Sequence, residues 1–333
     1  MKQEVSRMIL DQCTLGELLS RQEIRPVAQD AIRGRALWEE PVWNMSLKRL
    51  REERVFLGDI GAGLNRLLRA AATGDWYYPL YSEDECRKVE ARRGVSLVWC
   101  PSDDPRADGR PFILVVPGGG FVNVWNLTEG WPIADRFNRL GYHAFVLTYQ
   151  VDAEEKLLFS NMEDIARGLL LIREKQARFH VSGDNYITCG FSAGGYLVCL
   201  WNTSLGYRAF GLNRPRACFP VYPVVSLRED VRYGETGPEW DRRLFGCSAA
   251  QAIRRDFEIP DHAEGFPPCS ICLAGDDGLV NPENSRILYR ALTELHIPCR
   301  LETGPAGGHG FADGTDTSLA GWPERAVSWY EGL

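Results

Sequence analysis

The chain has 333 residues, of which 44% are hydrophobic and 25% are charged, and its formal net charge is -7 with a pI near 5.4. This composition is typical of a globular protein with a sizeable apolar core, and the absence of a dense run of Lys or Arg argues against a nucleic-acid partner. Because no apolar run reaches the length of a membrane span and the N-terminus is too charged for a signal peptide, we expect a cytoplasmic protein without a membrane partner.

The first 75 residues are expected to form a helical extension. They show no strand alternation, and residues 14–17 (TLGE) have the spacing of a capping box at a helix start. Their apolar side chains must be buried against the rest of the chain, over the active site, or in a subunit interface that would make a homo-oligomer. These apolar positions are Leu47, Leu50, Leu57, Ile60, Leu64, Leu67 and Leu68. The sequence does not decide whether this region forms a lid, an interface or a packed extension.

From about residue 95 onward, short apolar runs alternate with amphipathic stretches, which predicts an α/β fold with a mostly parallel central sheet flanked by helices. The predicted strands are Val95–Trp99, Phe112–Val116, Ala144–Tyr149, Tyr186–Cys189, Ala217–Val221, Cys269–Ala274 and Cys299–Thr303. Apolar residues at helical spacing mark two of the helices, one across residues 162–172 and the other across residues 287–295.

The ten cysteines are expected to be reduced thiols. Cys189, Cys199 and Cys272 lie inside apolar runs, and the chain is far larger than the small secreted domains that depend on disulfides. Cys269 and Cys272 form a Cys-x-x-Cys pattern, but a strand would send them to opposite faces. Neither a zinc site nor a redox pair is therefore expected there.

The segment from 186 to 196 (YITCGFSAGGY) has the pattern of a nucleophile elbow, because Gly-x-Ser-x-Gly follows a predicted strand and precedes a helix-compatible stretch. In such a turn the serine is strained, and a Cβ at Gly190 or Gly194 would collide with neighbouring backbone. The turn also directs the N–H of Ala193 at the reaction centre. Ser192 is the predicted nucleophile.

A serine hydroxyl needs a base within hydrogen-bonding reach, and the base needs a carboxylate to orient it. Of the five histidines, His309 lies in a glycine-rich loop (GGHGF) after the last predicted strand, where this fold places its base. Asp276 and Asp277 follow the predicted strand that ends at residue 274. Either aspartate gives the chain order Ser, Asp, His that this fold requires.

Residues 117–121 (PGGGF) directly follow a predicted strand, and three consecutive glycines let backbone N–H groups approach an oxyanion. The alternative is a phosphate-binding loop, but the Gly-Lys-Ser/Thr pattern of such loops is absent. The elbow elsewhere in the chain favours the oxyanion interpretation.

The motifs together are residues 117–121 (PGGGF), 190–195 (GFSAGG), 275–277 (GDD), 280–285 (VNPENS) and 308–311 (GHGF). With them, residues 76–333 resemble the acetylesterase and acetylxylan-esterase-like branch of the α/β-hydrolase superfamily. The Asp-x-x-Val pattern of that branch maps onto Asp277 and Val280, and so favours Asp277 over Asp276. Pro117 stands where the hormone-sensitive-lipase branch has histidine, which also favours the acetylesterase branch.

The resemblance implies a catalytic triad of Ser192, Asp277 and His309. It also implies an oxyanion hole formed by Gly119, Gly120 and Ala193. The catalytic domain would cover residues 76–333 and follow a helical extension over residues 1–75. The implied enzyme is a serine esterase that works through an acyl-enzyme and needs neither a metal nor a cofactor. Its implied substrates are short-chain acyl esters, chiefly acetyl esters, and these include acetylated carbohydrates.

Three aromatic residues near the motifs, Phe121, Trp125 and Phe311, are expected to line the substrate pocket, and their bulk predicts a preference for short acyl groups. The same scaffold also carries amide or peptide hydrolases and ligand-binding homologues without activity, so these remain the alternatives.

Overall fold

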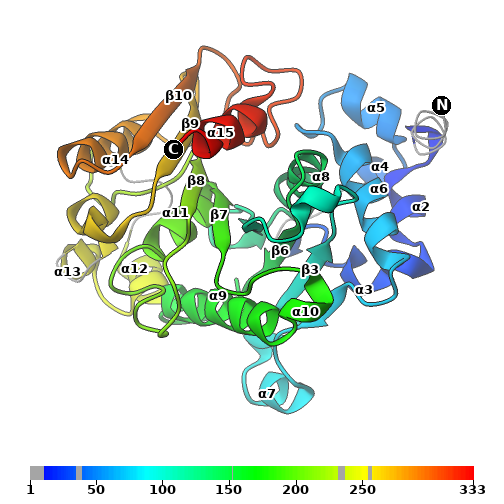
Figure 1. Cartoon of the computed structure of the whole chain (residues 1–333), viewed down its shortest axis with the longest axis horizontal. Coiled ribbons are helices and arrows are strands. Elements are labelled where there is room, and N and C mark those ends of the chain that lie inside the picture. The colour runs from blue at the N-terminus through cyan, green and yellow to red at the C-terminus, as the bar shows by residue number, and fades with distance from the viewer. Residues whose placement is uncertain (1–10, 35–39, 152, 232–236, 254–256) are drawn as a thin grey trace.

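The computed structural model describes residues 11–34, 40–151, 153–231, 237–253 and 257–333, and an eight-stranded sheet lies at its centre (Figure 1). The strands of this sheet are β2 (Tyr77–Pro79), β3 (Ser96–Cys100), β4 (Phe112–Val116), β6 (Ala144–Thr148), β7 (Tyr186–Phe191), β8 (Ala217–Val221), β9 (Cys269–Ala274) and β10 (Cys299–Gly304). Their order is β10-β9-β8-β7-β4-β6-β3-β2. The strands from β10 to β6 in this order run parallel, whereas β3 is antiparallel to both β6 and β2.

The predicted strands are all present, with ends that differ from the prediction by no more than two residues. The sequence did not indicate β2, because this edge strand has only three residues and ends in Pro79. The prediction of a helical extension over the first 75 residues also did not include one short strand. The two residues of β1 (Arg33–Gly34) pair antiparallel with β5 (Asn123–Val124).

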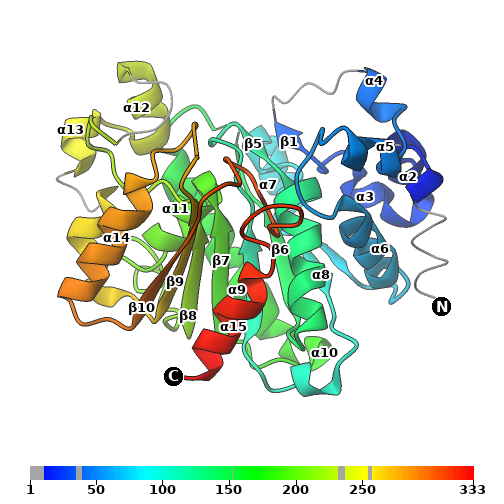
Figure 2. The same ribbon diagram turned by 90° about the horizontal axis from the view of Figure 1, so that it is seen from above.

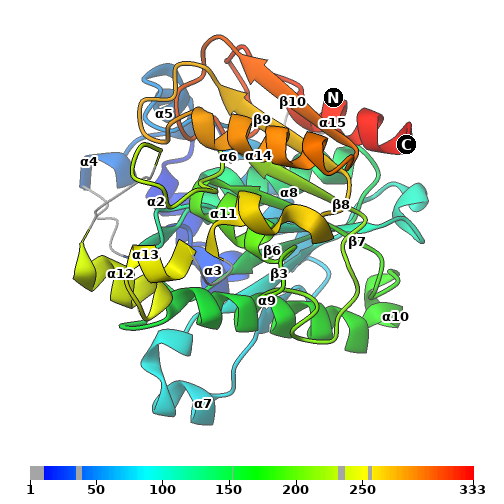
Figure 3. The same cartoon turned by 90° about the vertical axis from the view of Figure 1, so that its left-hand side faces the viewer.

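Helices cover both faces of the sheet (Figure 3). Along β4, Phe112 and Leu114 pack in one apolar core and Ile113 and Val115 in the other, as the alternation of a strand requires. The first core also contains residues of α9 (Leu157–Glu174), α11 (Ser192–Leu200) and α14 (Glu283–Glu294), and the second contains residues of α8 (Trp131–Arg139) and α15 (Trp322–Glu331). The shorter helices of this part are α7 (Glu83–Lys88), α10 (Gln176–Phe179), α12 (Pro238–Phe245) and α13 (Ala249–Ala252).

The N-terminal region is helical, and Figure 2 shows α8 between α15 and these helices. They are α2 (Leu15–Leu19), α3 (Arg25–Ala28), α4 (Glu40–Trp43), α5 (Leu47–Glu52) and α6 (Ile60–Ala71). The capping box is confirmed: the Thr14 hydroxyl accepts from the N–H of Glu17, whose carboxylate accepts from the N–H of Thr14. Leu64 and Leu67 are fully buried in the same core as α8, so these helices pack against the body of the protein.

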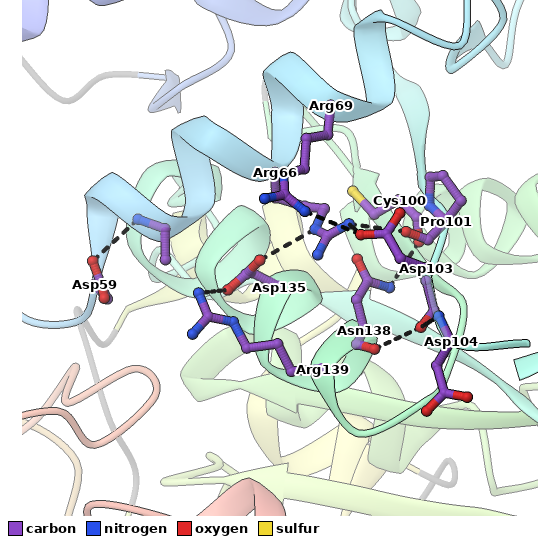
Figure 4. Close-up of polar contacts among 12 residues, drawn as sticks. Asp59, Arg66, Arg69, Cys100, Pro101, Asp103, Asp104, Asp135, Asn138 and Arg139 are labelled. Atoms are coloured by element: carbon purple, nitrogen blue, oxygen red, sulfur yellow. Dashed lines mark hydrogen bonds and ion pairs between the residues drawn. The ribbon is translucent and has the colours of Figure 1, made fainter. Parts of the chain in front are cut away.

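A buried ion pair joins α6 to α8 (Figure 4). Arg66 Nε donates to Asp135 Oδ1 at 3.2 Å, and only 5% and 4% of the two side chains are exposed. Arg139 contacts the other carboxylate oxygen at 2.6 Å. One turn before Arg66 the two helices touch so closely that a Cβ at Gly63 would lie 2.7 Å from Pro132. The contact therefore combines close packing with a neutralised buried charge.

None of the ten cysteines, all of which lie in the described residues, forms a disulfide, as predicted. Cys269 and Cys272 lie in β9 and belong to opposite apolar cores, so they cannot act as a pair. Burial raises the pKa of the Cys272 thiol well above its ordinary value. In the part of the chain that the structure describes, no helix has the length and apolar character needed to cross a membrane.

Candidate active site

Ser192 lies at the tight turn between β7 and α11. Its φ of 51° is in the left-handed region, which a residue with a side chain rarely adopts. A Cβ at Gly190 would lie 2.4 Å from the carbonyl oxygen of Gly194, and a Cβ at Gly194 would lie 2.1 Å from that of Val116. Glycine is therefore required at both positions, and the turn presents the serine at the carboxyl edge of the sheet.

His309 lies in the loop after β10 and contacts both of its predicted partners. Its Nε2 lies 2.9 Å from Ser192 Oγ, and its Nδ1 lies 2.7 Å from Asp277 Oδ2. The Asp277 side chain is 2% exposed and that of His309 is 14% exposed. The structure thus brings serine, histidine and aspartate together in one hydrogen-bonded series at the ends of three strands.

The two neighbouring aspartates have different partners. Asp277 Oδ1 accepts from the N–H groups of Leu279 and Val280, both at 2.9 Å, which leaves Oδ2 for the histidine. Asp276 is exposed and its Oδ1 accepts from the N–H groups of Gly307 and Gly308 at 2.9 and 2.8 Å. Asp277 therefore orients the His309 ring, whereas Asp276 holds the loop that carries it.

The glycine loop after β4 passes close to the serine. A Cβ at Gly118 would lie 2.9 Å from the Cβ of Ser192, and Gly119 and Gly120 have φ values of 138° and 62°. Within the described residues, the N–H groups of Gly119, Gly120 and Ala193 donate to no protein acceptor. Such N–H groups beside a nucleophile can stabilise a developing oxyanion.

Glu129 and Tyr222 connect the glycine loop with the histidine loop, and neither was predicted. Glu129 is buried; its Oε2 accepts from the N–H of Gly118 at 2.6 Å and its Oε1 from the hydroxyl of Tyr222 at 2.9 Å. The Tyr222 hydroxyl also accepts from the N–H of Ala312, and its ring lies 4.8 Å from that of His309. Burial raises the pKa of Glu129, while the hydrogen bond from Gly118 opposes that shift.

A signal for Glu129 does exist in the sequence, since a glutamate lies between Leu127 and Trp131 and shortly after a glycine loop. Its partner Tyr222 is 93 residues away, so no local pattern relates the two. Among the described residues, no group of three or more His, Cys, Asp or Glu is placed to hold a metal ion.

A cavity of about 910 Å³ opens beside Ser192 and His309, and Trp125 lines it as expected. The expectation that Phe121 and Phe311 line this cavity is wrong. The Phe311 ring is fully buried against Tyr222, with ring centroids 4.6 Å apart. Phe121 turns away to pack on Tyr196 and lines a small separate apolar cavity. Burial of both rings in the core removes more apolar surface from water than exposure in this cavity would.

Comparison with known proteins points to one family. A family model described as alpha/beta hydrolase fold matches residues 113–313. The chain is 30% identical over 213 residues to an acetylxylan esterase of Xylanibacter ruminicola, which covers 61% of the chain and 41% of that protein. It is 29% identical over 238 residues to endo-1,4-beta-xylanase B of Butyrivibrio fibrisolvens, which covers 68% of the chain and 36% of that protein. The chain thus spans less than half the length of either relative.

Solved structures share the fold. An acetyl ester-xyloside bifunctional hydrolase from Caldicellulosiruptor lactoaceticus matches with a TM-score of 0.63 at 24% identity, over 77% of this chain and 95% of that one. The carboxylesterase Cest-2923 from Lactobacillus plantarum matches with a TM-score of 0.58 at 21% identity, over 72% and 92% of the two chains. At these identities the likeness concerns the fold alone.

Proposed function

The chain belongs to the α/β-hydrolase fold family, and from this premise we propose that it is a serine esterase that removes short acyl groups, above all acetyl, from alcohols that include sugar hydroxyls. The observation that carries the proposal is the hydrogen-bonded series from Ser192 through His309 to Asp277. A buried aspartate that holds a histidine against a strained serine is the arrangement that activates a hydroxyl as a nucleophile.

The mechanism follows from these contacts. Asp277 accepts a hydrogen bond from the Nδ1–H of His309, so the neutral ring has an unprotonated Nε2 that takes the proton of Ser192 as Oγ attacks the ester carbonyl. The protonated histidine then gives this proton to the departing alcohol, and an acyl-enzyme remains. A water molecule, deprotonated by the same Nε2, then attacks the acyl carbon. The protonated histidine returns that proton to Ser192 Oγ as the bond from Oγ to the acyl carbon breaks and the carboxylic acid leaves.

An oxyanion forms in both steps, and we assign its stabilisation to the N–H groups of Gly119, Gly120 and Ala193. Removal of one such donor typically costs about 10²–10³-fold in rate. Glu129 supports this role because its bond to the Gly118 N–H fixes the approach of the loop. Since loop and nucleophile come from different strands, their relative position decides the rate.

The choice of ester over other acyl compounds rests on the comparisons. The acetylxylan esterase and the acetyl ester-xyloside hydrolase carry acetyl esters in their names.

The proposal is tested with the purified chain on p-nitrophenyl acetate, butyrate and octanoate, on acetylated xylan and on p-nitroacetanilide. The acetate is expected to react at least about tenfold faster than the octanoate, in line with the acetyl esters that the names of the relatives describe. The anilide is expected to react more slowly still, and a chelator to have no effect. If no ester is hydrolysed, the esterase proposal fails and the alternative of a binding protein is favoured. If p-nitroacetanilide is cleaved faster than p-nitrophenyl acetate, the chain is an amidase.

A further inference from the structure

One wall of the cavity beside Ser192 comes from the N-terminal region. Residues 54–57, which connect α5 to α6, line the cavity together with Gly119 and Gly120 of the glycine loop. This segment precedes residue 113, where the match to the family model begins. The Phe56 ring meets the Trp125 ring edge to face, with centroids 6.2 Å apart. The N-terminal helices therefore contribute directly to the space that a substrate must occupy.

This wall has a fixed position. Asp59 caps α6 by accepting from the N–H of Ala62 at 3.1 Å, and the pair of Arg66 and Asp135 attaches α6 to α8 (Figure 4). Helix α8 begins at Trp131, directly after the helical turn that carries Glu129. The wall and the glycine loop are thus anchored on the same helix, so the distance between them is a property of the fold.

The cavity is larger than a short acyl group requires. Its volume of about 910 Å³ lies in the range of about 300–1,000 Å³ that is common for pockets of drug-sized ligands. Once the carbonyl lies between Ser192 and the glycine loop, an acetyl group extends by one methyl only. Most of the cavity, including the wall of residues 54–57, is therefore left for the alcohol part of the ester.

The lining of this remaining space combines aromatic rings with polar groups. Phe56, Trp125 and Trp240 are half-buried, and Arg54 and Thr128 add polar atoms beside them. A sugar ring presents apolar C–H groups on its faces and hydroxyl groups at its rim. Aromatic side chains pack against such C–H faces, and polar neighbours hydrogen-bond to the rim.

We propose that Phe56 and Trp125 form a binding site for the sugar ring of a saccharide ester, on the alcohol side of Ser192. The proposal rests on the esterase function above and adds the region that selects the alcohol. Residues 54–57 act on specificity, whereas the triad acts on the acyl transfer that all acetates share.

The test compares three acetates with the same acyl group: methyl acetate, phenyl acetate and acetylated xylobiose. In Phe56→Ala, the ratio of kcat/KM for acetylated xylobiose to that for methyl acetate is expected to fall about tenfold, mainly through KM, as the loss of an aromatic contact implies. Phe56→Tyr keeps the ring and should keep the ratio. Phe210→Ala is the matched control, because Phe210 is 37% exposed, stacks on Trp201 and lies outside the cavity.

The outcomes separate the two proposals. If the wild type hydrolyses no acetate, the esterase function fails and the binding site fails with it. If it hydrolyses methyl acetate but Phe56→Ala leaves the ratio unchanged, only the sugar site is refuted. A loss confined to phenyl acetate would also refute it, since the wall would then select flat aromatic alcohols. Circular dichroism and the thermal midpoint of each variant verify that the fold is intact.

Discussion

Ser192 illustrates why this site could be predicted from the sequence. Its turn is closed by Gly190 and Gly194, and the steric reasons for these glycines lie within a few residues, so the pattern is visible locally. The pairing of Glu129 with Tyr222 has no such local origin, because it depends on how β8 lies beside the glycine loop. Sequence patterns therefore predict the residues of the reaction better than the residues that position them.

The two aspartates offer a direct test at this scale. Asp277→Asn should lower kcat by roughly 10²–10⁴-fold, because the amide no longer holds His309 in the required tautomer. Asp276→Asn should lose clearly less, since Asp276 accepts from the backbone N–H groups of Gly307 and Gly308 and not from His309. Steady-state kinetics on p-nitrophenyl acetate measures both, and a larger loss in Asp276→Asn would show that the acid is misassigned.

Glu129 should act as a positioning residue. In Glu129→Gln a single amide oxygen must replace the two carboxylate oxygens that accept from Gly118 and Tyr222, so one donor loses its acceptor. We expect kcat to fall roughly ten- to a hundredfold with little change in KM, as a shifted oxyanion loop implies. Tyr222→Phe removes the bonds of its hydroxyl to Glu129 and Ala312 but keeps the bond between Glu129 and Gly118, so kcat should fall less. An unchanged kcat in Glu129→Gln would contradict the role.

At the scale of elements, continuous apolar runs predicted the inner strands because strands such as β4 and β7 are buried on both faces. The same logic could not find β2, which is short and at the edge, or β1, whose two residues pair only with β5. For the N-terminal helices the sequence left three locations open. The structure buries Leu64 and Leu67 against the body, while Leu57 lies at the cavity.

The contact between α6 and α8 should stabilise the fold. Arg66→Ala leaves Asp135 buried, and breaking a buried pair costs roughly 3–5 kcal/mol; because Arg139 still contacts Asp135, we expect about 3 kcal/mol. Arg69→Ala is the matched control on the same helix, since Arg69 pairs with the exposed Asp103 and should cost less than about 1 kcal/mol. Urea unfolding measures both, and equal losses would refute the importance of the buried pair.

The attachment of α9 to the sheet should make stability depend on pH. Asp164 on α9 is fully buried and accepts from Tyr81 and Gln150, and burial raises the pKa of its carboxyl to about 6. Because the folded state then holds the proton more tightly than the unfolded state, ionisation lowers the free energy of unfolding as pH rises from about 4 to 6.

Asp164→Asn has no proton to lose at this position. Its destabilisation relative to the wild type should therefore be smaller at pH 7 than at pH 4, by about 2 kcal/mol. Urea unfolding of both proteins at the two pH values gives this difference. A destabilisation that is equal at both values, or larger at pH 7, would contradict the assignment.

On the scale of the whole molecule, one core continues from the N-terminal helices into the sheet, and one cavity is lined by both regions. The division into an extension over residues 1–75 and a catalytic domain over residues 76–333 remains a prediction. A homo-oligomer through these helices also remains one, and light scattering against the chain mass of 37.5 kDa would test it. Such an interface would need side chains other than Leu64 and Leu67, which the chain itself buries.

The central claim is that Ser192 is a nucleophile activated by His309, and covalent labelling tests it most directly. A fluorophosphonate reacts with an activated serine and leaves its phosphonyl group on Oγ. After reaction and proteolysis, mass spectrometry should find one phosphonyl group per chain, on the peptide that contains Ser192. Ser192→Ala should not be labelled, and His309→Ala should be labelled far more slowly. Labelling on another residue, or full labelling of Ser192→Ala, would contradict the claim.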